Sequence, residues 1–253
     1  MQTKTKTTAQ TTTAPKIKKL LSDGSTNAKT AKNSLKTFIL YLSPYTQNSF
    51  GKNMCANASK GCIEACLFSA GMGKFKNVIA ARIAKTDYLL SDRQSFLDQL
   101  AKEILYHYAK AKRNGERIAF RLNGTSDLDF FSLLQRYAQL DVTKLADHAS
   151  FYEYTKNINY IKRWQGAKNI TYTFSRSETN STLIPAAIEY GANVAAVFKG
   201  PLPTVYNVGG IDIPVLDGDQ SDIIMIYNKG KILGLKAKGM AKKDLTGFVI
   251  DQE

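Results

Sequence analysis

Cysteine, histidine and tryptophan are scarce in this chain of 253 residues, which holds three cysteines, two histidines and one tryptophan. All three cysteines lie in the segment from Cys55 to Cys66. An odd number of cysteines in one short segment is poorly explained as the disulfide framework that holds small secreted domains together, and a regulatory disulfide is the minor alternative. The arrangement instead favours a ligand that takes several sulfur atoms at once.

Long apolar runs are also absent, and none approaches the roughly 18 residues that a membrane span needs. The N-terminus lacks the apolar segment of a secretory signal. The sequence therefore predicts a cytoplasmic protein with no membrane partner. The glycine-rich, nucleophile and metal-ligand motifs of Rossmann, P-loop, serine-hydrolase and zinc-protease enzymes are missing too, which argues against those classes.

Acidic residues are outnumbered, 21 against 35 lysines and arginines, which gives a net charge of +14. Residues 1–36 hold eight of the lysines and are rich in threonine, so we expect a basic, low-complexity N-terminal arm there. This excess of positive charge favours a polyanionic partner such as a nucleotide or nucleic acid. A solubilising, solvated surface would have the same composition. The oligomeric state is left open.

Residues 37–253 are expected to form a single α/β domain. Short β-branched or aromatic runs predict strands at 37–42, 118–122, 151–154, 170–174 and 194–198, alternating with helices at 75–90, 91–114, 128–140, 157–165 and 181–190. Ser91 and Gln94 are spaced as a capping box for the second of these helices. This alternation predicts a partial or irregular (β/α) barrel of roughly six parallel units.

The part of the chain from 205 to 253 is expected to add a short antiparallel β segment. Asn228 and Gly230 lie between two apolar runs, 223–227 and 232–235, in the pattern of a hairpin turn.

Polar residues follow the predicted strands, and the carboxyl ends of parallel strands meet at one edge. Asp127 and Glu178 are the candidate catalytic residues. The candidate cofactor-binding residues are Asn123, Thr125, Ser126, Ser175 and Arg176. Residues of these types also begin helices and form turns, so local structure explains each of them singly.

The cysteines lie in an unusually long connection, residues 43–73, after the first predicted strand. Cys55, Cys62 and Cys66 are the candidate metal ligands. Three thiolates can hold a [4Fe–4S] cluster and leave one iron open to a substrate. Structural zinc is the alternative, with His148, His107 or Glu64 as its fourth ligand.

Several segments together resemble the bacteriophage gene product 88 family, whose activity is poorly characterised. They are Asn27–Thr30, Leu40–Pro44, Cys55–Cys66 with Ala70–Gly71, Arg121–Asp127, Tyr154–Lys156, Thr173–Glu178, Val215–Asp219 and Gly234–Gly239. The resemblance implies a phage protein, located in the host cytoplasm.

The layout is also similar, more weakly, to radical S-adenosylmethionine enzymes, which place a three-cysteine loop after the first strand of a partial barrel. That similarity implies an oxidoreductase or transferase with a [4Fe–4S] cluster and S-adenosylmethionine as cofactors. The leading hypothesis is an iron–sulfur protein of phage type that acts on a nucleotide or nucleic acid. The rival is a non-catalytic, replication-associated nucleic-acid-binding protein with a structural cluster or zinc.

Overall fold

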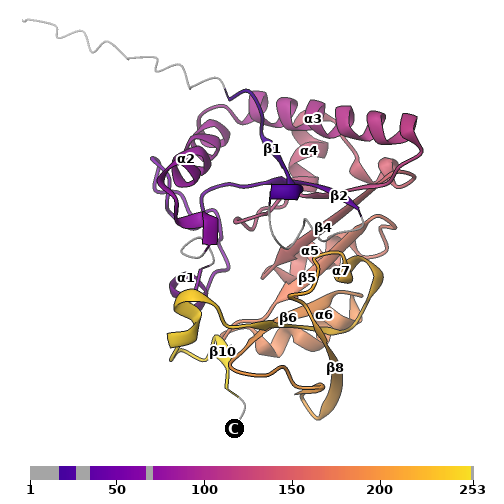
Figure 1. Ribbon diagram of the computed structural model, residues 1–253. Helices are drawn as coiled ribbons and strands as arrows, with labels where there is room; N and C mark the ends of the chain where they lie inside the picture. Colours follow the sequence, from indigo (N-terminus) through magenta and orange to yellow (C-terminus); the bar gives the residue numbers. More distant parts are fainter. Residues whose placement is uncertain (1–16, 27–34, 67–70, 252–253) are drawn as a thin grey trace, which may run out of the picture.

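A computed structural model of the chain describes residues 17–26, 35–66 and 71–251. Most of the predicted N-terminal arm lies outside the described residues. Within these residues ten strands form one sheet, in the order β1-β2-β3-β4-β5-β6-β9-β8-β7, and β10 also pairs with β6 (Figure 1).

Seven neighbouring strands of this sheet run parallel. In sheet order they are β2 (Lys36–Leu40), β3 (Ile118–Arg121), β4 (Ala149–Thr155), β5 (Ile170–Ser175), β6 (Asn193–Phe198), β9 (Ile232–Lys236) and β8 (Ile211–Asp217). The five strands predicted between residues 37 and 198 are all present. Because the seven strands run parallel, their carboxyl ends lie along one edge of the sheet.

The predicted barrel is wrong, because the sheet is mixed and open. β1 (Leu21–Asp23) pairs antiparallel with β2 at one edge, and β7 (Val205–Val208) pairs antiparallel with β8 at the other. A barrel closes only when its first and last strands pair, and among the described residues β1 and β7 do not. β1 belongs to the segment that the sequence assigned to the basic arm.

The C-terminal β segment also differs from its prediction. The hairpin turn is at Gly209 and Gly210, whose φ angles of 58° and 90° suit the tight turn between β7 and β8. Asn228 has an extended backbone with φ of −122°, so no hairpin turn forms there. The preceding run forms helix α7 (Ile224–Tyr227), and β9 joins the sheet in parallel between β6 and β8.

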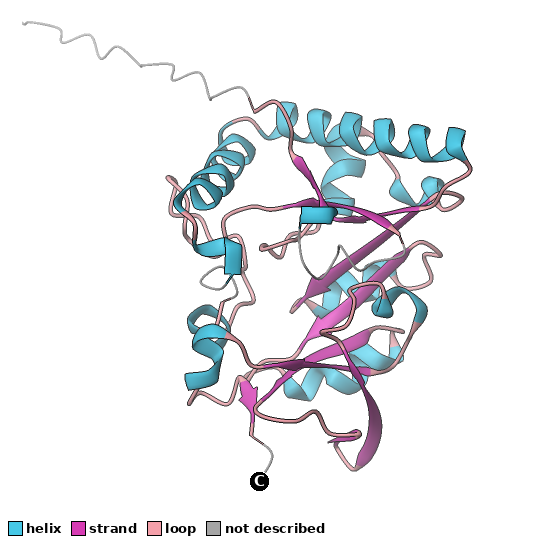
Figure 2. Ribbon diagram, in the orientation of Figure 1, coloured by secondary structure: helices cyan, strands magenta, loops and turns pink. Residues whose placement is uncertain are grey.

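Helices cover the sheet on one main face, and Figure 2 shows α5 and α6 behind the strands. The α-helices are α1 (Lys60–Glu64), α2 (Lys76–Ser91), α3 (Arg93–Asn114), α4 (Phe130–Ala138), α5 (Ile158–Trp164), α6 (Ile184–Glu189) and α7. Shorter 3₁₀ turns are η1 (Gly24–Thr26), η4 (Gly71–Lys74), η5 (Val142–Leu145), η6 (Ser181–Leu183) and η7 (Gly239–Lys243). The predicted helices are confirmed to within a few residues, but Asp92, not Ser91, caps α3 by accepting a hydrogen bond from the Ser95 amide.

The core follows the two-residue alternation of the strands. Phe120 and Phe151 join the large apolar core beneath the helices, whereas the adjacent Ala119 and Tyr152 face the opposite side, where α7 contributes Met225. In the described part of the chain, no helix is both long and apolar enough to cross a membrane.

Candidate functional site

The cysteine segment, residues 43–66, runs along the carboxyl edge of the parallel strands after β2. In Figure 1 its helix α1 lies beside the yellow C-terminal segment that contains η7. Ala65 of this segment is buried together with Ala241 and Val249. The cysteine segment and the C-terminal segment therefore meet at the edge where the strand-end residues gather.

The end of β3 holds the first part of the cysteine segment. The Asp127 amide donates a hydrogen bond of 2.9 Å to the carbonyl oxygen of Met54, and the Thr125 hydroxyl donates to the carbonyl oxygen of Leu42. The Cys55 sulfur lies 3.8 Å from the carbonyl oxygen of Thr125. These contacts place Cys55 directly over the turn that contains four of the predicted site residues, Asn123, Thr125, Ser126 and Asp127.

The end of β5 holds the second part of the segment through Glu178. Its carboxylate accepts hydrogen bonds of 2.7 Å from the Ser59 hydroxyl and 2.8 Å from the Gly61 amide. Ser59 caps α1 and accepts from the Cys62 amide at 3.3 Å. Burial pushes the pKa of Glu178 upward, but the hydrogen bonds from Ser59 and Gly61 outweigh it and lower the pKa. Glu178 is thus ionised at neutral pH and serves as an anchor for α1.

Asp127 ties β3 to the neighbouring strand. Its carboxylate accepts hydrogen bonds of 2.7 Å from the Thr155 hydroxyl and 2.9 Å from the Lys156 amide. Burial raises the pKa of this carboxyl, against the lowering effect of the two bonds. Asp127 is 9% exposed, so it lies at the edge but is mostly covered.

Other predicted site residues, in the turns that follow β3 and β5, form local hydrogen bonds. The Asn123 side-chain oxygen accepts from the Ser126 hydroxyl and from the Leu128 amide, both at 2.9 Å. After β5, the Ser175 carbonyl oxygen accepts from Asn180 at 3.0 Å. These bonds shape the two turns, as expected for residue types that favour turns and helix starts.

Arg176 reaches the C-terminal segment. Its Nη1 atom donates to the carbonyl oxygens of Gly247 and, at 2.8 Å, Phe248. The Lys156 ammonium lies 6.0 Å from the centre of the Phe248 ring. The structure therefore gathers Asp127 with Cys55, and Glu178 with Cys62, while Arg176 holds residues 247–248 against the same edge.

All three cysteines are thiols and all are partly exposed. Burial, together with the charges of Asp127, Cys66 and Cys62, raises the pKa of Cys55 to about 11. Within residues 17–26, 35–66 and 71–251, no three histidine, cysteine, aspartate or glutamate side chains are grouped closely enough to hold a metal ion. The sulfurs are near enough to influence one another, but they are not preassembled as a ligand set.

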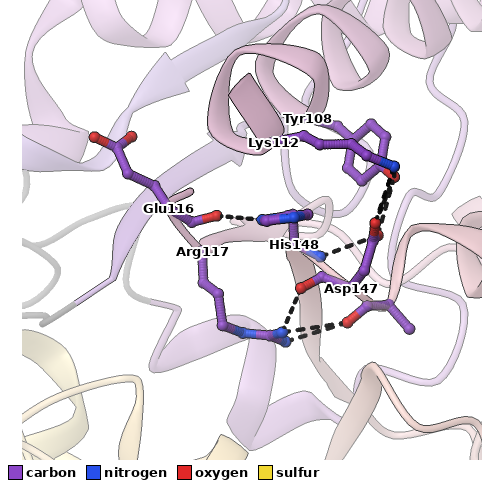
Figure 3. Close-up of polar contacts among 7 residues, drawn as sticks. Tyr108, Lys112, Glu116, Arg117, Asp147 and His148 are labelled. Atoms are coloured by element: carbon purple, nitrogen blue, oxygen red, sulfur yellow. Dashed lines mark hydrogen bonds and ion pairs between the residues drawn. The ribbon is translucent and has the colours of Figure 1, made fainter. Parts of the chain in front are cut away.

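The two histidines considered as zinc ligands lie elsewhere. His148 precedes β4, at the amino end of the sheet, and its Nδ1 atom lies 2.7 Å from the Glu116 carbonyl oxygen (Figure 3). His107 stacks on Phe38 with 3.7 Å between ring centres. Only Glu64, in α1, is close in sequence to the cysteines, and it pairs with Lys60 at 4.0 Å.

Two charged residues near this edge were not singled out from the sequence. Glu153 is 1% exposed and accepts hydrogen bonds from the amides of Leu122 and Asn123, the latter at 2.9 Å. Burial raises the pKa of Glu153 to about 7. Arg121 forms an ion pair of 3.2 Å with Asp222. The signal that could have identified Glu153 is its position as a charged residue inside the apolar run 151–154.

Comparison with known proteins identifies a family but gives no relative of assigned function. No curated protein and no solved structure matches the chain. The similarity to radical S-adenosylmethionine enzymes gains no support from these comparisons. The family model described as "Gene product 88" matches residues 7–252, which confirms the resemblance drawn from the sequence. The chain therefore belongs to the gene product 88 family.

Proposed function

We propose that this protein is an iron–sulfur protein in which Cys55, Cys62 and Cys66 hold a [4Fe–4S] cluster at the carboxyl edge of the sheet. The observation that carries the proposal is the double anchoring of the cysteine segment. Thr125 and Asp127 hold its first part, and Glu178 holds the turn that begins α1. Two separate strand ends thus position a segment that contains every cysteine of the chain.

The chemistry of the donor set fits such a cluster. Thiolates are the usual ligands of iron–sulfur clusters, and three of them leave one iron open to a further ligand. Assembled thiolates repel one another, and the raised pKa of Cys55 reflects part of that repulsion. Binding of a cationic centre would offset this cost and release the thiol protons. Because the sulfurs are not preassembled, loading requires the segment to close around the cluster.

The proposal extends to the class of reaction and of substrate. When bound, the cluster would supply one-electron chemistry at an open iron, and the polar residues of the strand ends would bind the substrate beside it. A nucleotide or nucleic acid is the substrate class that the net charge of +14 favours. Reductive cleavage of S-adenosylmethionine is the reaction to test first, with 5′-deoxyadenosine as its measurable product.

Anaerobic purification tests the cluster. Wild type should contain iron and acid-labile sulfide in stoichiometric amounts and absorb broadly in the visible range, and Cys62→Ala should lose both. Asn57→Ala, in the same segment but exposed and without sulfur, is the matched control and should keep them. Colourless wild-type protein with stoichiometric zinc and no sulfide would overturn the iron–sulfur assignment in favour of zinc.

Nucleic-acid binding without catalysis is the second candidate, favoured by the same positive charge. Binding through phosphate contacts weakens steeply with salt, because counterions are released on association. The affinity for a single-stranded oligonucleotide should therefore fall by an order of magnitude or more between 50 and 200 mM salt. An affinity that does not change with salt would count against this candidate.

A further inference from the structure

Arg82 carries a guanidinium group in which two buried nitrogen atoms have no hydrogen-bond acceptor in the described part of the chain. Arg82 lies in the middle of α2, and its buried Nε and Nη1 atoms donate to no acceptor among the described residues. Burial lowers the pKa of Arg82. Buried cationic groups are normally paired with an anion or a carbonyl oxygen, since an unpaired one is costly to remove from water.

Other buried or half-buried cations of the protein follow that rule. Arg121 pairs with Asp222 at 3.2 Å, and the Lys85 ammonium donates a hydrogen bond of 2.6 Å to the carbonyl oxygen of Leu20. Lys85 lies on the same helix as Arg82, so the scaffold provides a hydrogen-bond acceptor to one cation of α2. Among the described residues nothing accepts a hydrogen bond from Nε or Nη1 of Arg82, so these two donors are available to an added anion.

The surroundings of Arg82 place it at the cysteine segment. Its guanidinium carbon lies 5.2 Å from the centre of the Tyr41 ring, directly after β2 at the carboxyl edge. The charge of Cys66 is near enough to act on Arg82. Gly124 packs closely against this ring, because a Cβ atom there would lie only 2.5 Å from Cδ1 of Tyr41. The cation thus lies over the Tyr41 ring and near the end of the cysteine segment.

We propose that Arg82 is an anion-binding residue that receives the carboxylate or phosphate group of the ligand bound at the cysteine segment. This inference deepens the proposed function, on which it rests for the location of the site. Guanidinium groups suit both anions, because their planar set of N–H donors matches carboxylate and phosphate oxygens. The stacking of the guanidinium on Tyr41 orients these donors before the ligand arrives.

The test compares wild type with Arg82→Met and Arg136→Met, all as anaerobically purified full-length protein. Arg136 is the matched control, because its guanidinium carbon lies over the Tyr137 ring at 5.5 Å, on a different helix. The melting temperature is measured in chloride, in inorganic phosphate and in acetate at equal ionic strength. Iron and sulfide are assayed on the same samples, so a missing cluster is recorded separately from a missing anion effect.

Wild type and Arg136→Met should melt at a higher temperature in phosphate or acetate than in chloride, and Arg82→Met should lose that increment. In chloride, Arg82→Met should melt at or above the wild-type temperature, because methionine removes a half-buried charge with two unsatisfied buried donors. An increment in phosphate alone identifies a phosphoryl group, and one in acetate a carboxylate. The same increment in Arg82→Met as in wild type, or none in wild type, would overturn the proposal.

Discussion

Glu178 and Ser59 are 119 residues apart in the chain, yet the Glu178 carboxylate accepts a 2.7 Å hydrogen bond from the Ser59 hydroxyl. The same carboxylate accepts from the Gly61 amide, so one side chain at the end of β5 holds the first turn of α1. Since Cys62 lies in that turn, the position of its sulfur depends on Glu178.

Removing this anchor should expose the cysteine segment. In Glu178→Ala, Cys62 should be alkylated by iodoacetamide several times faster than in wild type at pH 8, and stability should fall by about 1–3 kcal/mol. Glu189→Ala is the control, because Glu189 is an exposed carboxylate on α6. Peptide mass spectrometry gives the rates, and equal rates in both variants would show that Glu178 does not position α1.

The anchor should also be sensitive to acid. The folded-state pKa of Glu178 is below its usual value, so its contribution to stability is present above pH 4.5 and is lost as pH falls through the folded pKa. The difference in unfolding free energy between wild type and Glu178→Gln should therefore shrink toward pH 3. Denaturant titrations across this range measure it, and a constant difference would contradict the assignment.

Gly61 is the point where α1 touches the C-terminal segment. A Cβ atom at this position would lie 2.6 Å from Cβ of Phe248 and 2.1 Å from Oγ1 of Thr246. Gly61→Ala should therefore destabilise the protein by about 1–3 kcal/mol through overpacking. Thr246→Ala should recover part of that loss in the double variant, as measured by urea unfolding. A Gly61→Ala protein as stable as wild type would contradict this close packing.

Cys55 should react slowly with thiol reagents. Because burial raises its pKa to about 11, its alkylation rate should keep rising well above pH 9, whereas in the unfolded chain it should level off near the ordinary thiol pKa of about 8.5. Asp127→Asn removes a nearby negative charge and should shift the folded profile to lower pH. Mass spectrometry of the Cys55 peptide provides both profiles; a folded profile that levels off below pH 9 would rule out the raised pKa.

Because of Glu153, the free energy of unfolding should decrease as the pH rises. Its pKa is about 7 in the folded protein against an ordinary value of 4.5, so the folded state binds the proton more tightly. The unfolding free energy should decrease between about pH 4.5 and 7, by at most about 1.4 kcal/mol per pH unit from this group. Glu153→Gln should flatten that slope, with Glu189→Gln as an unchanged control.

The local elements of this protein could be predicted from its sequence. Alternating apolar residues in the runs around Phe120, Phe151 and Phe174 identify strands, and the apolar stripe from Leu97 to Ile104 identifies the longest helix. Parallel pairing also follows from the strand and helix alternation. The convergence of Asp127, Glu178 and the cysteine segment at one edge is a consequence of that pairing.

Other features depend on contacts between distant segments. The sequence predicted a partial barrel, but the sheet is open. β1 pairs antiparallel with β2 at one edge, and β9 lies between β6 and β8. The residue pattern of a strand shows which of its two faces is buried. It does not show which strands lie beside it, because that depends on the whole sheet. The guanidinium donors of Arg82 that lack an acceptor among the described residues are visible only once α2 is packed against Tyr41.

The sequence by itself determined the family, the strands and helices, and the single segment that contains every cysteine. Only the tertiary structure decided that the sheet is open and that Glu178 and Asp127 anchor this segment. It also showed that, among the described residues, two buried nitrogen atoms of Arg82 have no hydrogen-bond acceptor. The physical reason is that periodicity and turn chemistry act over a few residues, whereas burial, charge pairing and sheet order are set by residues a hundred or more positions apart.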